Sequence, residues 1–171
     1  MKKSLFLFCI LAVLFVQVVS AQQLGELYRE RNAGFTMSMP AGWQTFDFNQ
    51  KYLMIMGPED SGLSPNIGFA DEAYNGSISG YVDIFLPLIQ QFFSDFSMVD
   101  RSSFTTSAGV TGECVTYTAT MGTIRVRQKV YVFPNRRGNA IMVITGTAPV
   151  NSGTRYDEIF DASVKTFVWT R

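Results

Sequence analysis

The sequence of 171 residues contains no histidine and only two cysteines. Without histidine, the chain lacks the most common general base, the Ser-His-Asp and Cys-His catalytic arrangements, and most zinc and copper sites. Basic and acidic residues are balanced at 14 each, so the excess of positive charge that nucleic-acid binding needs is missing as well. These absences predict a protein that is not an enzyme, holds no metal or cofactor and does not bind nucleic acid.

Paired carboxylates are the one catalytic device that the composition still allows. Adjacent acidic residues occur at 59–60, 71–72 and 157–158. Neighbouring residues of a strand point to opposite faces, so such pairs do not converge on one reacting atom by themselves. We expect these acids to be solvated charges or helix-start residues, and a carboxylate-based hydrolase is the least favoured alternative.

Residues 1–21 have the pattern of a secretory signal peptide. Two lysines precede an apolar run over residues 5–16, and small residues end at Ala21. A membrane-spanning helix needs roughly 20 apolar residues, and Gln17 ends the run earlier. Cys9 lies inside the run, not at a lipid-attachment position. We therefore expect cleavage after Ala21, export to the periplasm or the cell exterior, and no transmembrane segment in the mature chain.

Residues 22–171 have the size of a single domain, and no repeat or low-complexity linker divides them. Removal of the two leader lysines leaves twelve basic and fourteen acidic residues. Cys114 is then the only cysteine, so an intramolecular disulfide is excluded. We expect this cysteine to be a small buried residue on a strand.

Periodicity predicts an α+β fold with an antiparallel sheet of about six to eight strands and two main helices. Residues 79–96 and 154–168 repeat apolar side chains at helical spacing. Four consecutive strands without intervening helices indicate an antiparallel meander and exclude a parallel α/β architecture. Two aromatic residues, Trp43 and Phe167, are expected in the core. The strands are expected near 34–39, 43–48, 52–56, 67–70, 99–106, 113–120, 123–133 and 140–147.

The helix predicted at 79–96 is apolar over most of its circumference, with only a narrow polar strip. Pro87 falls on that strip, where it is expected to leave the packed face intact. We expect the apolar stripe to form core against the sheet. The alternative is that the aromatic residues and eight methionines bind an apolar small molecule. The stripe consists of Tyr81, Phe85, Leu88, Phe92 and Phe96.

Three segments of the chain resemble the PsbP-like family. They are GFTMSMPAGW, which contains the Pro-x-x-Trp motif at 40–43, IMVITGTAP in the last meander strand, and YDEIFDASVKTF in the closing helix, which ends at Thr166-Phe167. The order of elements agrees over nearly all of the mature chain. The resemblance implies an antiparallel sheet sandwiched by helices, and a protein that binds partners or stabilises assemblies without catalysing a reaction.

The strand from residue 123 carries three cations on one face. Arg125, Arg127 and Lys129 alternate with apolar residues. A two-residue turn at Met121-Gly122 would place Thr118 opposite Arg125, Thr116 opposite Arg127 and Cys114 opposite Lys129. This face, lined by the two threonines, is either the solvated side of the sheet or a docking surface for an acidic partner or anionic ligand.

Export, the resemblance and the missing chemistry favour one function over the others. We expect an exported, non-enzymatic binding or assembly module of the cell envelope, with an acidic envelope protein or anionic ligand as partner. A periplasmic carrier of an apolar small molecule is the alternative.

Overall fold

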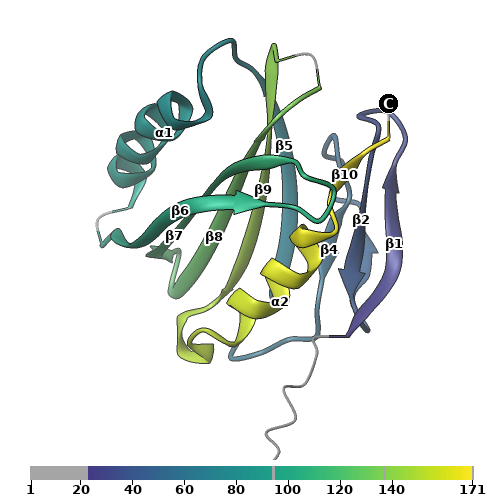
Figure 1. Cartoon of the computed structure of the whole chain (residues 1–171). Coiled ribbons are helices and arrows are strands. Elements are labelled where there is room, and N and C mark those ends of the chain that lie inside the picture. The colour runs from purple at the N-terminus through teal and green to yellow at the C-terminus, as the bar shows by residue number, and fades with distance from the viewer. Residues whose placement is uncertain (1–22, 94, 137, 171) are drawn as a thin grey trace, which may run out of the picture.

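The computed structural model describes residues 23–93, 95–136 and 138–170. Within them, two α-helices and two antiparallel sheets make up the fold (Figure 1). The larger sheet has the order β3-β4-β5-β9-β8-β7-β6, and the smaller has the order β1-β2-β10. The strands are β1 (Leu24–Glu30), β2 (Phe35–Pro40), β3 (Gln44–Phe46), β4 (Met54–Met56), β5 (Asn66–Ala73), β6 (Ser97–Thr105), β7 (Thr111–Met121), β8 (Ile124–Pro134), β9 (Ala140–Pro149) and β10 (Val168–Trp169). The helices are α1 (Ile78–Phe92) and α2 (Arg155–Lys165), and a short 3-10 helix spans Val150–Ser152.

The predicted class, an α+β fold with an antiparallel sheet between helices, is confirmed. The four meander strands β6 to β9 follow one another across the larger sheet, and β5 pairs with β9. Helix α1 covers one face of this sheet, while α2 and the small sheet lie on the other (Figure 1). The alternation of side chains along β8 therefore sends successive residues toward opposite helices.

Two apolar cores fill the spaces on either side of the larger sheet. The core under α2 is aromatic, and both residues expected there are buried: Trp43 is 9% exposed and Phe167 is fully buried. The ring of Trp43 meets that of Phe160 edge-on at 6.2 Å, and Phe167 stacks on Phe133 at 5.3 Å. Burial of such rings supplies much of the free energy of folding.

A glycine sets how closely α2 approaches the sheet. A Cβ atom at Gly146 of β9 would lie 2.5 Å from the ring of Phe160. Because that separation is far inside van der Waals contact, any larger residue would push the helix outward. Glycine at this position lets the Phe160 ring lie flat against the strand.

The ends of both helices differ from the prediction. Helix α1 begins at Ile78, where the Ser77 side chain accepts a hydrogen bond from the Gly80 amide, and it ends at Phe92. Helix α2 ends at Lys165 because the chain then turns into β10, which pairs with β2. Thr154 makes no side-chain capping bond.

Strand β1 is absent from the prediction. The large apolar residues of Leu24–Glu30 are at positions 24, 27 and 28, so the segment lacks the alternation of apolar and polar residues that indicates a strand. In the structure only Tyr28 of this strand is buried. Strand β1 is stabilised by its antiparallel pairing with β2. The proposed leader, residues 1–21, lies outside the described residues.

Candidate functional site

Two of the three predicted surface cations are not on the surface. The Arg127 guanidinium donates to both carboxylate oxygens of Asp157 in α2, with distances of 2.6–3.1 Å, and Lys129 lies 2.6 Å from Asp161. The side chains of Arg127 and Lys129 are only 15% and 14% exposed. The prediction of a solvated sheet face is therefore wrong at these positions, because α2 packs over it.

The predicted strand register is also wrong, by two residues. Thr118 lies opposite Arg127, and Thr116 opposite Lys129. The turn consists of Gly122 and Thr123 and not of the pair before it. An even shift keeps every side chain on its predicted face, so both threonines still line the cations, and both are buried.

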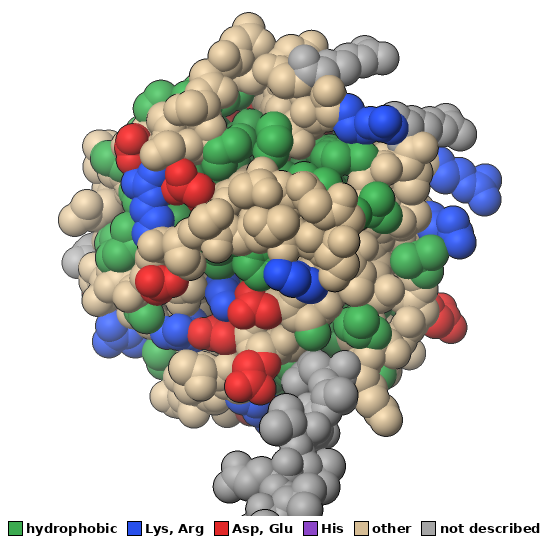
Figure 2. Space-filling model, in the orientation of Figure 1, with side chains coloured by type: hydrophobic (Ala, Val, Ile, Leu, Met, Phe, Trp, Pro, Cys, Tyr) green, Lys and Arg blue, Asp and Glu red, His purple; other side chains and the backbone are tan. Residues whose placement is uncertain are grey.

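Arg125 is the one predicted cation that keeps substantial contact with solvent. Its side chain is 52% exposed, lies 3.9 Å from the Asp95 carboxylate and donates a long hydrogen bond of 3.4 Å to Thr118. In the space-filling view, basic side chains over the lower part of the molecule lie beside acidic ones (Figure 2). The geometry therefore divides the five predicted residues between an internal ion-pair layer and a single exposed arginine.

One carboxylate of each acidic pair is held by other side chains. Asp60 accepts hydrogen bonds from Ser152, Ser61 and Tyr156, which lower the pKa of its carboxyl. Asp71 is held by Lys51, and Asp157 by Arg127. Within the described residues, no group of three or more metal-ligating side chains occurs.

Cys114 lies in the core under α2, as expected. It is 3% exposed, and burial raises the pKa of its thiol to about 12. A thiol in this state is a poor nucleophile at neutral pH.

Helix α1 leaves three large apolar side chains exposed to solvent. Ile84, Leu88 and Phe92 are 57%, 49% and 80% exposed, and their spacing of four residues places them along one side of the helix. We call these three residues the α1 stripe. Only Tyr81 and Val82 of the helix are buried.

The assignment of Leu88 and Phe92 to the core was therefore wrong. The larger sheet receives Tyr81, Val82, Phe85, Leu86 and Ile89 from the same helix. A helix that is apolar nearly all round has more apolar surface than one contact face can bury. The narrow polar strip was the signal in the sequence that could have revealed the excess.

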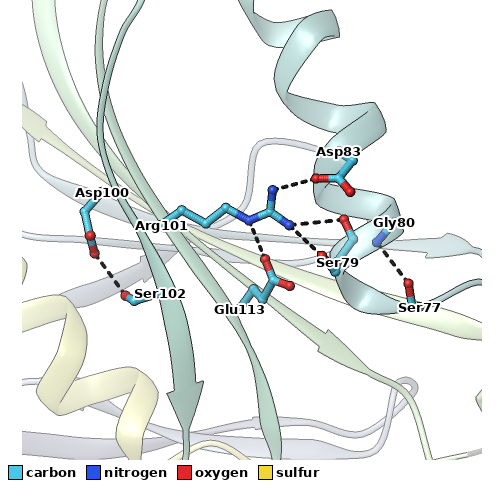
Figure 3. A network of polar contacts seen from close by, with 8 residues as sticks. All are labelled: Ser77, Ser79, Gly80, Asp83, Asp100, Arg101, Ser102 and Glu113. Carbon is cyan, nitrogen blue, oxygen red and sulfur yellow. Dashed lines mark hydrogen bonds and ion pairs between the residues drawn. The ribbon is translucent and has the colours of Figure 1, made fainter.

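An ion-pair network fixes the first turns of α1 to the sheet (Figure 3). The guanidinium of Arg101 in β6 contacts Asp83 of α1 at 2.6 Å and Glu113 of β7 at 2.7 Å. It also donates to the hydroxyl and carbonyl oxygens of Ser79. Asp83 is the only charged residue of α1, so the α1 stripe has no free charge on its own helix.

A shallow groove of about 710 Å³ lies beside this network. Its walls include Ile78 at the start of α1, Ser103 of β6 and Glu113 of β7. The side chains of Phe85, Phe93 and Phe96 do not line it, because they pack on the sheet core. The groove is thus a shallow surface feature between α1 and the end of the sheet, with both apolar and polar side chains in its walls.

A second exposed apolar cluster provides a comparison. Phe46, the last residue of the short strand β3, stacks on Phe48 at 6.5 Å, and Leu53 is also exposed. Five of the eleven exposed large apolar side chains nevertheless fall between residues 84 and 99. The segment from α1 to the start of β6 therefore carries nearly half of the large apolar side chains that are exposed on the described surface.

Comparison with known proteins identifies the fold. No protein-family model matches the sequence, and no curated protein sequence matches it. The structure is similar to the cyanobacterial PsbP (CyanoP) of Synechocystis sp. PCC 6803, with 12% identity, a TM-score of 0.60, and coverage of 89% of this chain and 95% of that one.

Two further solved structures are similar to comparable extents. LpqN of Mycobacterium tuberculosis is 16% identical, with a TM-score of 0.59 and coverage of 85% and 90% of the two chains. The Saccharomyces cerevisiae protein Mog1p is 10% identical, with a TM-score of 0.57 and coverage of 86% and 97%. The fold is therefore PsbP-like. Identities at this level show the fold alone.

None of the helices in the described residues is long and apolar enough to cross a membrane.

Proposed function

We propose that this chain is an exported, non-enzymatic binding or assembly module of the cell envelope. In this proposal the α1 stripe binds an apolar surface on a protein partner. The observation that carries the proposal is the exposure of Ile84, Leu88 and Phe92 along one side of a helix. Exposed apolar side chains in contiguous arrangement mark interaction sites on soluble proteins.

The signal-peptide pattern of residues 1–21 supports the proposal that the protein is exported to the periplasm or the cell exterior. Two proteins with similar structures support such a role by analogy: LpqN is involved in cell envelope biogenesis, and Mog1p is a Ran-binding protein. A shared fold supports a function by analogy and does not specify the partner.

The chemistry of the partner follows from the charges around the stripe. Asp83 is engaged by Arg101, so neither end of that pair is free to select an oppositely charged surface. A complementary surface is therefore apolar and weakly charged, as in the centre of protein interfaces. Arg127 and Lys129 are paired with acids of α2, so Arg125 is the principal exposed cation among the five predicted residues that an anionic partner could contact.

Neither alternative function gains an observation in its favour. A carrier would need its aromatic residues around a cavity, and Phe85, Phe93 and Phe96 instead pack on the sheet. A hydrolase would need two carboxylates facing one cleft, and Asp60, Asp71 and Asp157 are each held by other side chains.

The test compares two double variants in the native host. Leu88→Ser with Phe92→Ser removes most of the stripe, and Phe46→Ser with Phe48→Ser removes a similar amount of exposed apolar surface elsewhere. Tagged full-length proteins are isolated from solubilised envelope, and co-purified proteins are quantified by mass spectrometry.

We expect the stripe variant to lose a defined set of partners by roughly tenfold or more, since two apolar interface residues contribute on the order of 1–2 kcal/mol each. The control variant should retain them. Equal recovery by the two variants and the parent, at unchanged melting temperature, would overturn the proposal.

A further inference from the structure

Segments that are far apart in the sequence meet at one end of the molecule and enclose a groove. The β1–β2 turn at residues 31–34, the β8–β9 turn at residues 135–136 and 138–139, and the end of β10 lie together there (Figure 1). The groove has a volume of about 680 Å³, which is within the size range of small-molecule sites. We call it the turn groove. Its walls include Asn32, Asp71, Arg136, Asn139 and Trp169.

The unpaired side-chain groups of the turn groove are mainly hydrogen-bond donors. The Arg136 side chain is exposed and forms no ion pair with any described residue. The side-chain oxygens of Asn135 and Asn139 accept hydrogen bonds of 3.1 Å and 2.8 Å within the turn. The side-chain nitrogen of Asn139 and the side chain of Asn32 have no partner in the described part of the chain. A ligand that supplies oxygen acceptors would therefore satisfy these groups.

The carboxylates near the turn groove already have donors of their own. Both oxygens of Asp71 accept hydrogen bonds from the Lys51 ammonium, and one accepts a further bond of 2.9 Å from the Tyr52 hydroxyl. Glu30 precedes the β1–β2 turn and accepts a hydrogen bond of 2.9 Å from the Asn32 amide. Lys51 balances the charge of Asp71, and neither of the two carboxylates holds Arg136.

Positive charge predominates around the turn groove. Arg29 and Arg31 are exposed and, like Arg136, form no ion pair among the residues that the structure describes. In the space-filling view, basic side chains follow one another along the upper right of the molecule, and no acidic one lies between them in that view (Figure 2). Under α2, by contrast, Arg127 and Lys129 each have an acidic partner. The electrostatic field at the groove therefore favours an anion.

Trp169 gives the turn groove an apolar wall. Its indole N–H donates to the Pro134 carbonyl at 3.2 Å, and its ring meets those of Phe35 and Phe167 edge-on at 6.1 Å and 5.0 Å. These contacts fix the indole, while part of its surface remains exposed at the groove. A fixed aromatic surface favours contact with an apolar or planar group.

We propose that the turn groove binds a small organic anion, a carboxylate or a phosphate ester, whose planar or apolar body lies against Trp169. Arg136 and the side-chain amides of Asn32 and Asn139 donate to the oxyanion, and a guanidinium suits it because its two parallel N–H groups match two oxygens. The site does not include the α1 stripe, so its test is independent of the proposed function.

The first test compares probes that carry one or both parts of the ligand. Phenyl phosphate carries both, inorganic phosphate only the anion, and benzyl alcohol only the ring. Binding to the isotope-labelled protein is followed by nuclear magnetic resonance at constant ionic strength. We expect phenyl phosphate to shift the indole N–H signal of Trp169 and the side-chain amide signals of Asn32 and Asn139. Benzyl alcohol should bind at least about tenfold more weakly, and a parallel titration with benzoate identifies the preferred oxyanion.

Two variants separate the contact with the oxyanion from the contact with the ring. Arg136→Gln should weaken phenyl phosphate and inorganic phosphate alike by about tenfold. The matched control, Arg125→Gln, removes an arginine that is 52% exposed elsewhere, and it should change both affinities by no more than about twofold. Trp169→Leu should weaken phenyl phosphate several-fold and leave inorganic phosphate unchanged. Partial unfolding of this variant would weaken both probes, so the ratio of their affinities isolates the aromatic contact.

Three results would each overturn the proposal. They are equal binding by the Arg136→Gln and Arg125→Gln variants, equal binding of benzyl alcohol and phenyl phosphate, and an unchanged affinity ratio in Trp169→Leu. A membrane surface is the other source of phosphate, and sedimentation with phosphatidylcholine vesicles containing phosphatidate tests it. If Arg136 is needed for binding to these vesicles while phenyl phosphate and benzoate do not bind, the ligand is a lipid surface and the proposal of a small-molecule site fails.

Discussion

The ion pair between Arg127 and Asp157 provides the sharpest test of how α2 is seated. Both side chains are 15% exposed, and both carboxylate oxygens of Asp157 accept hydrogen bonds from the Arg127 guanidinium. Changing Arg127 to alanine leaves the Asp157 carboxylate beneath the helix without its partner. Breaking a buried pair costs about 3–5 kcal/mol, and the residual exposure favours the lower end, about 3 kcal/mol.

The matched control is Arg125→Ala. That side chain is 52% exposed and 3.9 Å from Asp95, so its loss should cost about 0–1 kcal/mol. For a chain of this size, about 3 kcal/mol corresponds to a lowering of the melting temperature by roughly 6–12 °C. The double variant Arg127→Met, Asp157→Leu should recover most of the loss, since it leaves no unpaired charge.

The assay is urea unfolding followed by tryptophan fluorescence. Trp43 is buried against Tyr156 and Phe160 of α2, so its share of the emission reports whether the helix is docked, and a Trp169→Phe background removes the signal of the second tryptophan. If Arg127→Ala shifts the midpoint no further than Arg125→Ala does, the ion pair does not hold α2 and the argument is refuted.

Three further predictions concern the core, the thiol and acid stability. Phe167→Ala should cost about 3–5 kcal/mol, measured by the same unfolding assay, because the ring is fully buried; an unchanged midpoint would place the ring outside the core. Cys114 should resist alkylation at pH 8 in the native protein and react after unfolding, because burial raises the pKa of its thiol to about 12; rapid native labelling, read by intact mass, would contradict this. Hydrogen bonds from the Thr120 hydroxyl and amide lower the pKa of Asp95 below 3.8, so the stability they confer is present above the unfolded value and is lost as the pH falls through the lower folded value. Thr120→Ala should therefore flatten the pH dependence of the urea midpoint below about pH 4, and an unaltered slope would show that this carboxyl does not contribute.

The sequence predicted the architecture well because the meander strands alternate regularly between two buried faces. Cys114, Thr116 and Thr118 lie on the predicted side of β7, and Arg127 and Lys129 on the predicted side of β8. Alternation fixes which residues share a face, and it contains no information on what covers that face. The position of α2 depends on contacts between residues about 30 apart in the chain.

The candidate site was predicted less well, for a related reason. The apolar pattern of a helix shows how much apolar surface the helix has. It does not show how much of that surface the sheet can cover. Leu88 and Phe92 have the same character as Phe85 and Leu86, and only the position of the sheet separates the exposed pair from the packed one. The turn groove depends on how distant segments of the chain meet, which no local pattern specifies.

The ion pairs under α2 also determine where the helix can sit along its own axis. Asp157 and Asp161 are about 6 Å apart along the helix, and Arg127 and Lys129 about 7 Å apart along the strand, so the two spacings match in one alignment. If the helix slid by one turn so that Asp161 faced Arg127, Lys165 would face Lys129, and two like charges would meet where an attractive pair was lost. Apolar contacts alone are not directional, so they would tolerate small displacements of α2 along its axis. The two ion pairs therefore favour one position of α2 along its axis. That position also determines where the chain leaves the helix, and so allows Val168–Trp169 to pair with β2 in the small sheet.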